Sequence, residues 1–273
     1  MLKIYADSSC SIKKEELENY DITLIPLKIA FGSDEYFDGD ISFDDFYNLL
    51  ENTKNFPKTS LPALAKVERE INTLTHEGNE VIIVTLSSKI SGTYNALKLL
   101  FNENEKVHII DSGSAVGAMR FIIDEIIKNK DKPVDEILNI VEELKPRIKT
   151  MAVPETLTYL LKGGRLSKAE WLIGSILQIK PTIGFVDGKV RVISKNRGIK
   201  KAMREIVDVV SEKADLSYGL IAAYTKNKDN VKELIEMLPD EVKDSINVYD
   251  NLSTSIAAHW GPGAFGLIFV EKK

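Results

Sequence analysis

Short apolar runs alternate with amphipathic helical patterns through the first half of the chain. Val81 to Thr85 is an uninterrupted apolar run that predicts a buried strand, and Ala96 to Phe101 has the spacing of a helix. The same alternation predicts strands over 3–7, 22–31 and 107–111 and helices over 12–20, 42–50, 63–76, 115–128 and 133–144. Strands that alternate with helices are typical of a parallel sheet covered by helices on both faces.

The pattern changes near residue 150. Thr182 to Ile193 reads as two strands joined by Asp187-Gly188, which is the strongest hairpin signal in the chain. Further strands are predicted over 150–154, 218–225, 246–249 and 265–270, and helices over 155–161, 168–178, 200–213 and 231–238. We therefore expect an α/β fold of two domains. Residues 1–149 form a domain with a largely parallel sheet and flanking helices, and residues 150–273 form an α/β domain with a mixed or antiparallel sheet.

Hydroxyl groups gather where predicted strands end and helices begin. Ser91-Gly92-Thr93 follows the strand 81–85, and Thr59-Ser60 precedes the helix 63–76. Free amides and the partial positive charge at a helix start favour a phosphate or a carboxylate. Ser and Thr are also ordinary helix caps, so Thr59 and Ser60 fit a cap to the helix 63–76, and Ser91 fits either role.

A histidine in a glycine-rich tail is the third candidate group. His259 comes just before Gly261-Pro262-Gly263, where the backbone can approach a ligand closely, although a buried structural imidazole is the simpler interpretation. His259 could also act as a base for Ser91, oriented by Asp7, Asp38 or Asp111, in an esterase or acyl-transfer enzyme. Ser91 lacks the small-x-Ser-x-small pattern of a hydrolase elbow. We rank hydrolysis below binding, because the sequence supplies no recognisable oxyanion hole or leaving-group acid.

Charge and composition remove several classes of protein. The net charge is −5 with no dense basic tract, which excludes nucleic acid as an expected partner. Cys10 is the single cysteine, so an internal disulfide and a multi-cysteine metal site are both excluded. The acidic pairs have no histidine at ligand spacing, and we expect neither a metal nor a cofactor. Without a secretory signal or a membrane-spanning run, a cytoplasmic location is expected.

Two basic segments remain as candidates. Gly163-Gly164-Arg165 could hold an anion or simply end a helix. The run from Lys195 to Lys201 includes Arg197 and Lys200, and such a run is usually a solvated face. On an acidic protein it is also the patch that could contact an acidic partner or, transiently, a membrane surface.

Together these segments resemble the DegV family, which includes the bacterial fatty-acid-binding proteins of the fatty acid kinase system. The resemblance spans the whole chain and rests on motifs spread along it: Asp7-Ser8, Tyr36-Phe37-Asp38-Gly39, Thr59-Ser60-Leu61-Pro62, Leu86-Ser87-Ser88 through Ser91-Gly92-Thr93-Tyr94, Asp111-Ser112, Gly163-Gly164-Arg165, Arg197 with Lys200-Lys201-Ala202, and His259 with Gly261-Pro262-Gly263-Ala264.

The resemblance implies a carrier rather than an enzyme. It would bind a long-chain fatty acid with the carboxylate at the domain interface, held by Thr59, Ser60, Ser91, Gly92 and His259, with Asp38 and Arg165 near the pocket. Residues expected to line an acyl tunnel are Leu160, Ile173, Ile176, Leu177, Ile183, Phe185 and Phe265, although apolar residues at helical spacing are more often plain core. An ATP-dependent kinase would phosphorylate the bound carboxylate to an acyl phosphate after docking at Arg197, Lys200 and Lys201.

Overall fold

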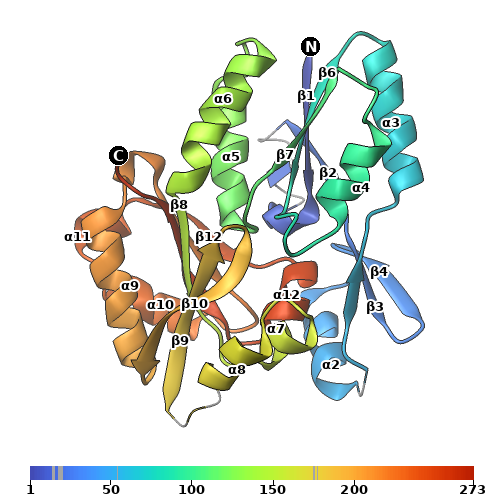
Figure 1. The fold of residues 1–273 in the computed structure, drawn as a ribbon. Coiled ribbons are helices and arrows are strands. Elements are labelled where there is room, and N and C mark those ends of the chain that lie inside the picture. Colours follow the sequence, from blue (N-terminus) through green and yellow to red (C-terminus); the bar gives the residue numbers. More distant parts are fainter. Residues whose placement is uncertain (14–15, 18–20, 54, 175, 177) are drawn as a thin grey trace. The chain divides into compact units, whose positions relative to one another are not determined.

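A computed structural model describes residues 1–13, 16–17, 21–53, 55–174, 176 and 178–273 of the chain (Figure 1). The chain forms two compact units. The first unit contains Met1–Glu142 and Ser253–Ser255, and the second contains Glu143–Leu252 and Ile256–Lys273. The boundary between residues 149 and 150 remains a prediction from the sequence pattern.

A parallel sheet forms the centre of the first unit. Its order is β2-β1-β6-β7, with every neighbouring pair parallel. The strands are β1 Leu2–Asp7, β2 Ile22–Ile25, β6 Glu80–Thr85 and β7 Val107–Asp111. Among the described residues, this unit contains α2 Phe43–Asn52, α3 Leu64–His76, α4 Thr93–Leu100, α5 Gly117–Lys128 and most of α6 Val134–Leu144, with a short 3-10 turn η1 at Ser8–Cys10.

Alternate residues of β1 and β6 explain why helices cover both faces of this sheet. Tyr5, Val81 and Ile83 pack in one buried cluster with residues of α3 and α4. The intervening Ile82 and Val84 are fully buried as well and point to the other face, where α5 contacts β6. Strands buried on both sides read as continuous apolar runs, and that pattern made β6 predictable.

The apolar pattern predicts one strand over 22–31, but two strands lie there, separated at Pro26. Ile22–Ile25 is β2 of the parallel sheet, whereas β3 Lys28–Phe31 lies in a separate antiparallel sheet of order β4-β3-β5. A proline cannot donate to a sheet, so it fits the point where the chain leaves one sheet for another. The prediction of a single strand over 22–31 is therefore wrong.

The two other strands of that small sheet were not predicted from the sequence. They are β4 Asp34–Phe37 and β5 Lys58–Ser60, which pair with β3 on either side. The helix expected over 12–20 falls largely on residues 14–15 and 18–20, which lie outside the described residues.

The second unit is built on a six-stranded mixed sheet of order β10-β9-β8-β13-β11-β12. The pair β11 and β12 is parallel and the other neighbouring pairs are antiparallel. The strands are β8 Ile148–Val153, β9 Ile179–Val186, β10 Lys189–Arg197, β11 Leu220–Tyr224, β12 Ile246–Asn251 and β13 Phe265–Val270. Asp187 and Gly188 both have positive φ in the tight β9–β10 turn, as the sequence predicted.

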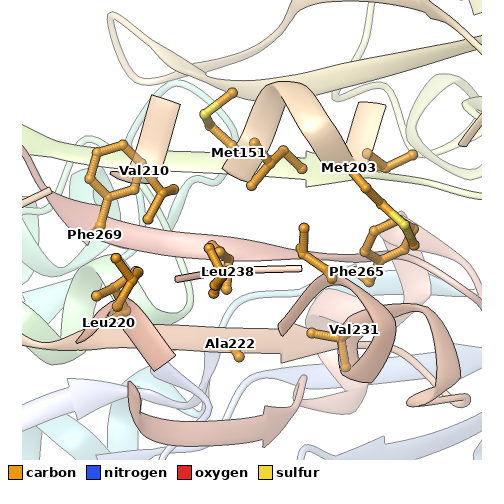
Figure 2. Packing of buried hydrophobic residues seen from close by; sticks show 14 of the residues in the cluster. Met151, Met203, Val210, Leu220, Ala222, Val231, Leu238, Phe265 and Phe269 are labelled. Carbon is orange, nitrogen blue, oxygen red and sulfur yellow. The ribbon is translucent and has the colours of Figure 1, made fainter. Parts of the chain in front are cut away.

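One face of this sheet packs against α9 and α10 (Figure 2). Met151, Phe265 and Phe269 from the sheet meet Met203 and Val210 of α9 in this buried cluster. The helices of the second unit are α7 Thr158–Lys162, α8 Lys168–Gly174, α9 Ile199–Lys213, α10 Asp229–Glu236 and α11 Asp240–Lys243, with short 3-10 turns η3 Lys145–Arg147 and η4 Leu216–Tyr218.

The last helix, α12 Thr254–Trp260, was not predicted. Its first residues belong to the first unit and the remainder belongs to the second. The parallel sheet of the first unit and the mixed sheet of the second confirm the predicted α/β fold class. Among the described helices, none combines the length and apolar character needed to cross a bilayer.

Candidate functional site

The loop between β6 and α4 closes on itself and presents Ser91. The amides of Ile90 and Ser91 both donate to the carbonyl of Ser87 at 3.1 Å. The Ser91 and Thr93 hydroxyls lie 3.0 Å apart, and the Thr93 amide donates to Ser91 Oγ at 3.3 Å. Ser91 is half-buried, and Gly92 directly precedes α4 without a side-chain cap. The loop thus holds a hydroxyl next to a helix start, where an anion is favoured.

Two carboxylates from neighbouring strands hold this loop. Asp7 Oδ2 at the end of β1 accepts from the Leu86 amide at 2.8 Å. Asp111 Oδ1 at the end of β7 accepts from the Ser88 amide at 3.2 Å. The structure therefore brings together the polar groups that follow these strands, because the carboxyl ends of parallel strands share one edge of a sheet. Asp7 is fully buried, and this desolvation raises its pKa to about 6.

Thr59 and Ser60 lie in β5 rather than at a helix cap. They pair with Ile29 and Lys28 of β3, and Ala63, the N-cap residue of α3, makes no side-chain cap bond. The cap interpretation of these two hydroxyls is therefore wrong. A Cβ built on Gly92 would lie 3.6 Å from Cδ2 of Leu61. Within the first unit, the segment after Ser60 thus lies beside the Ser91 loop.

Within the second unit, His259 packs on the end of α7. A Cβ built on Gly163 would lie 2.2 Å from His259 Nδ1. His259 is buried, and this desolvation together with the nearby Arg165 guanidinium lowers its pKa to about 3. The imidazole is therefore neutral at physiological pH. Arg165 donates to the Gly163 carbonyl, and its own pKa is lowered by burial.

Thr225 holds the glycine-rich tail that follows His259. Its hydroxyl donates to the Gly261 carbonyl at 2.7 Å and accepts from the Ala264 amide at 2.8 Å. Gly261 has φ +73, and a Cβ there would lie 2.3 Å from the ring of Tyr159. Only glycine combines this conformation with so close an approach to α7.

The candidate acyl-chain residues fall on two faces of the second sheet. Ile183 pairs with Ala152, and Ala152 pairs with Gly266. Residues directly opposite one another in a sheet lie on the same face, so these three residues share one face. Phe265 pairs with Val153 and belongs to the core beneath α9 and α10 on the opposite face. A ligand that lies against Ile183 would therefore be separated from Phe265 by the sheet.

The face of Ile183 is covered by α8, which also contacts α7. A Cβ on Gly174, the last residue of α8, would lie 2.5 Å from Leu157 and 3.5 Å from Pro181, which precedes Ile183 by two positions. Leu160 of α7 is buried, Ile173 and Phe185 are partly buried, and Ile176 is 58% exposed. Leu177 lies outside the described residues.

The basic candidates lie at the junction of β10 and α9. Arg197 ends β10 and is exposed, and Lys200 and Lys201 are exposed in the first turn of α9. Lys200 forms an ion pair with Glu233 of α10. These side chains thus form a basic surface that is accessible within the second unit.

Asp38, another predicted site residue, is hydrogen-bonded to three hydroxyl groups. It directly follows β4 and accepts from Ser8, Thr254 and Ser255. Sequence reasoning missed this role for Ser8, Thr254 and Ser255, and the only signal was the short run of hydroxyls before His259. Within the described part of the chain, no group of three or more His, Cys, Asp or Glu side chains is placed to hold a metal ion.

Comparison with known proteins decides the family. The model for "Uncharacterised protein, DegV family" matches residues 1–272. A DegV domain-containing protein of Caldanaerobacter subterraneus subsp. tengcongensis is 31% identical, with 99% of each chain covered. A DegV domain-containing protein of Staphylococcus aureus is 32% identical, with 98% of each chain covered.

The chain belongs to the DegV family. Among solved structures, the fatty acid binding DegV family protein of Streptococcus agalactiae matches with a TM-score of 0.89 at 25% identity, covering 100% of this chain and 99% of that one. DegV of Bacillus subtilis, a fatty acid binding protein, matches with a TM-score of 0.85 at 27% identity over 99% of each chain. A stearic acid-binding protein of Eubacterium ventriosum matches with a TM-score of 0.85 at 25% identity, covering 100% of this chain and 99% of that one. The DegV fold thus extends over the whole of this chain.

Proposed function

We propose that this DegV protein binds one long-chain fatty acid and is a carrier rather than an enzyme. The carboxylate would be held by Thr59, Ser60, Ser91, Gly92 and His259. The observation that supports this most is the full-length match to DegV proteins that bind fatty acids, combined with a half-buried hydroxyl at the Ser91 loop. The ligand would be the acid itself, without any metal or cofactor.

Neutral donors suit a carboxylate ligand. Ser91 keeps a hydroxyl proton for the ligand if Thr93 donates in the bond between their hydroxyls. His259 is neutral because burial and Arg165 lower its pKa, so it can donate one N–H without adding a charge. Arg165 then supplies the positive charge in the surroundings of His259. The carboxylate would be held mainly by hydrogen bonds, with a cation close enough to favour its ionised form.

The acyl chain would lie over the face of the second sheet that carries Ile183. Leu160, Ile173, Ile176, Leu177 and Phe185 are proposed to contact it, whereas Phe265 is proposed to be core alone because it faces α9 and α10. Each methylene removed from water contributes ~0.8 kcal/mol, so the chain would supply most of the binding free energy.

The phosphorylation step would belong to a partner. We propose that an ATP-dependent kinase docks at the exposed residues Arg197, Lys200 and Lys201 and phosphorylates the bound carboxylate to an acyl phosphate. The same basic surface would allow transient contact with an anionic membrane surface.

An esterase or acyl-transfer enzyme that uses Ser91 and His259 is the alternative. Within the first unit, the Ser91 hydroxyl bonds to Thr93, and an alcohol cannot serve as a general base. Titration of wild-type and Ser91→Ala protein with oleic acid, alongside assays with acyl esters, separates the two. The carrier predicts weaker binding by Ser91→Ala and no ester turnover by either protein. Ester turnover that Ser91→Ala abolishes would instead establish the enzyme.

A further inference from the structure

Asp38 is hydrogen-bonded to the first residues of α12. Its Oδ1 accepts from the Thr254 amide at 3.0 Å, the Thr254 hydroxyl at 2.7 Å and the Ser255 amide at 3.4 Å. Its Oδ2 accepts from the Ser255 hydroxyl at 2.6 Å. Thr254 and Ser255 are both buried, so these donors depend on Asp38 rather than on water.

The other contacts of Asp38 fix its own position. Ser8 donates its hydroxyl to Asp38 Oδ2 at 2.8 Å and accepts from the Leu27 amide at 3.0 Å. The Asp38 amide donates to the Leu27 carbonyl at 2.8 Å. The carboxylate is thus attached at one end to the loop after β1 and the segment after β2, and at the other end to α12.

The start of α12 needs such a partner. The first amides of a helix have no acceptor inside the helix, and a helix of seven residues is not stable by its own hydrogen bonds. The amide just before it, that of Ser253, donates to Ser11 Oγ at 3.1 Å, again from the segment after β1. Contacts from distant parts of the chain therefore determine where α12 begins.

His259 lies one turn beyond these contacts. Ser255 and His259 are four positions apart in α12, and residues at this spacing lie on the same face of a helix. Ser255 and His259 are therefore joined by a single turn of one continuous helix.

We propose that Asp38 is a positioning residue that orients His259 by fixing the first turn of α12. The expected effect on fatty-acid binding rests on the proposed function. The effect on the position of His259 does not, because it can be measured without any ligand.

The test uses full-length protein with Asp38→Ala, Asp38→Asn and Ser255→Ala. Asn keeps an acceptor for the two amides, so Asp38→Asn should rescue part of the effect of Asp38→Ala. Asp215→Asn is the matched control, because Asp215 accepts from Ser217 and Arg147 in the second unit and has no described contact with α12. Ser255→Ala removes one donor only and remains informative if Asp38→Ala does not fold.

The first readout is made without fatty acid. In Asp38→Ala we expect amide exchange of residues 257–260 to accelerate about tenfold or more, since hydrogen bonds to a charged group are among the stronger ones. The pKa of His259, followed by NMR of its ring, should rise toward its ordinary value as its burial loosens. Asp38→Asn and Ser255→Ala should show smaller changes of the same sign, and Asp215→Asn none. Unchanged exchange and an unchanged His259 titration in Asp38→Ala and Ser255→Ala would overturn the proposal.

The second readout is the dissociation rate of oleic acid. We expect faster dissociation from Asp38→Ala, partial rescue in Asp38→Asn and a wild-type rate in Asp215→Asn. If wild-type protein fails to bind fatty acid, the proposed function fails while the ligand-free readouts still decide the positioning. If wild-type binds and dissociation is unchanged in a variant whose His259 has moved, the link from Asp38 to binding is refuted.

Discussion

His259 lies so close to Gly163 that no other residue fits between them. A Cβ at Gly163 would be 2.2 Å from Nδ1 of the imidazole and 3.1 Å from the Tyr159 carbonyl. Gly163 has φ −73, so its backbone conformation would accept any residue. The glycine is therefore required by the imidazole and not by the turn.

Gly163→Ala should displace His259 and destabilise the protein by about 1–3 kcal/mol, the range for overpacking a buried site. In a His259→Ala background the same change should cost much less, because the clash is gone. Urea unfolding of the two single variants and the double variant measures this coupling. Additive free energies would show that the imidazole does not require the glycine.

His259 should make the protein less stable as the pH falls. Its pKa is lowered to about 3 in the fold and lies near 6.5 in the unfolded chain, so the unfolded state binds the additional proton between these values. The stability contributed by the neutral, buried imidazole is present above about pH 6.5 and is lost progressively toward pH 3. His259→Asn should remove this slope from unfolding curves measured across the window. An equal pH dependence of the unfolding free energy in both proteins would show that His259 is not its source.

Asp7 should act in the opposite direction. Its pKa is raised from 3.8 to about 6 by burial, so between these values the folded state holds a proton that the unfolded state has released. Protonation of Asp7 therefore increases the free energy of unfolding as the pH falls from about 6 toward 3.8. Carbon NMR of the Asp7 carboxyl should therefore show a midpoint near 6 in the folded protein. A midpoint at or below 3.8 would refute the effect of burial.

Phe265 and Ile173 should respond differently to substitution. Phe265→Ala should destabilise the protein by about 3–5 kcal/mol, the usual cost of truncating a buried phenylalanine, and leave the preferred acyl length unchanged. Ile173→Trp should shorten the longest acid that binds while costing little stability, because Ile173 is only partly buried. Titration with acids of increasing length measures both. A change of length preference in Phe265→Ala would return Phe265 to the ligand site.

Arg197→Ala should impair phosphorylation of bound fatty acid by a cognate kinase and leave fatty-acid binding intact. Arg197 is an exposed cation at the end of β10, so its loss should weaken an electrostatic contact without disturbing the core. Lys189→Ala, an exposed cation at the other end of β10, is the matched control. Loss of binding together with phosphorylation would point to a fold defect, and full phosphorylation would remove Arg197 from the docking surface.

The parts of the fold that follow from local pattern were predictable from the sequence. Continuous apolar runs identified β6 and β7, and Asp187-Gly188 identified the β9–β10 hairpin. The three residues of β5 show no apolar run and no alternation. They form a strand because they pair with β3, which is distant in the sequence. For that reason the local sequence around Thr59 and Ser60 favours helix caps, whereas the structure places both residues in a strand.

The start of α12 depends on contacts between residues that are still farther apart in the sequence. Asp38 contacts Thr254 across 216 positions, and no periodic pattern encodes that pairing. The short α12 that it holds was accordingly missed, although His259 itself was selected. The sequence allowed candidate residues to be chosen by their chemistry and by resemblance. Their hydrogen-bond partners, which are distant in the sequence, could be identified only from the structure.

We propose above all that this protein carries a fatty acid. The most direct measurement is mass spectrometry of the organic extract of purified protein that has been denatured, with an equal amount of an unrelated protein from the same host as the control. We expect about one long-chain fatty acid per protein molecule, absent from the control. Protein that yields no fatty acid and also binds none in titration would contradict the claim.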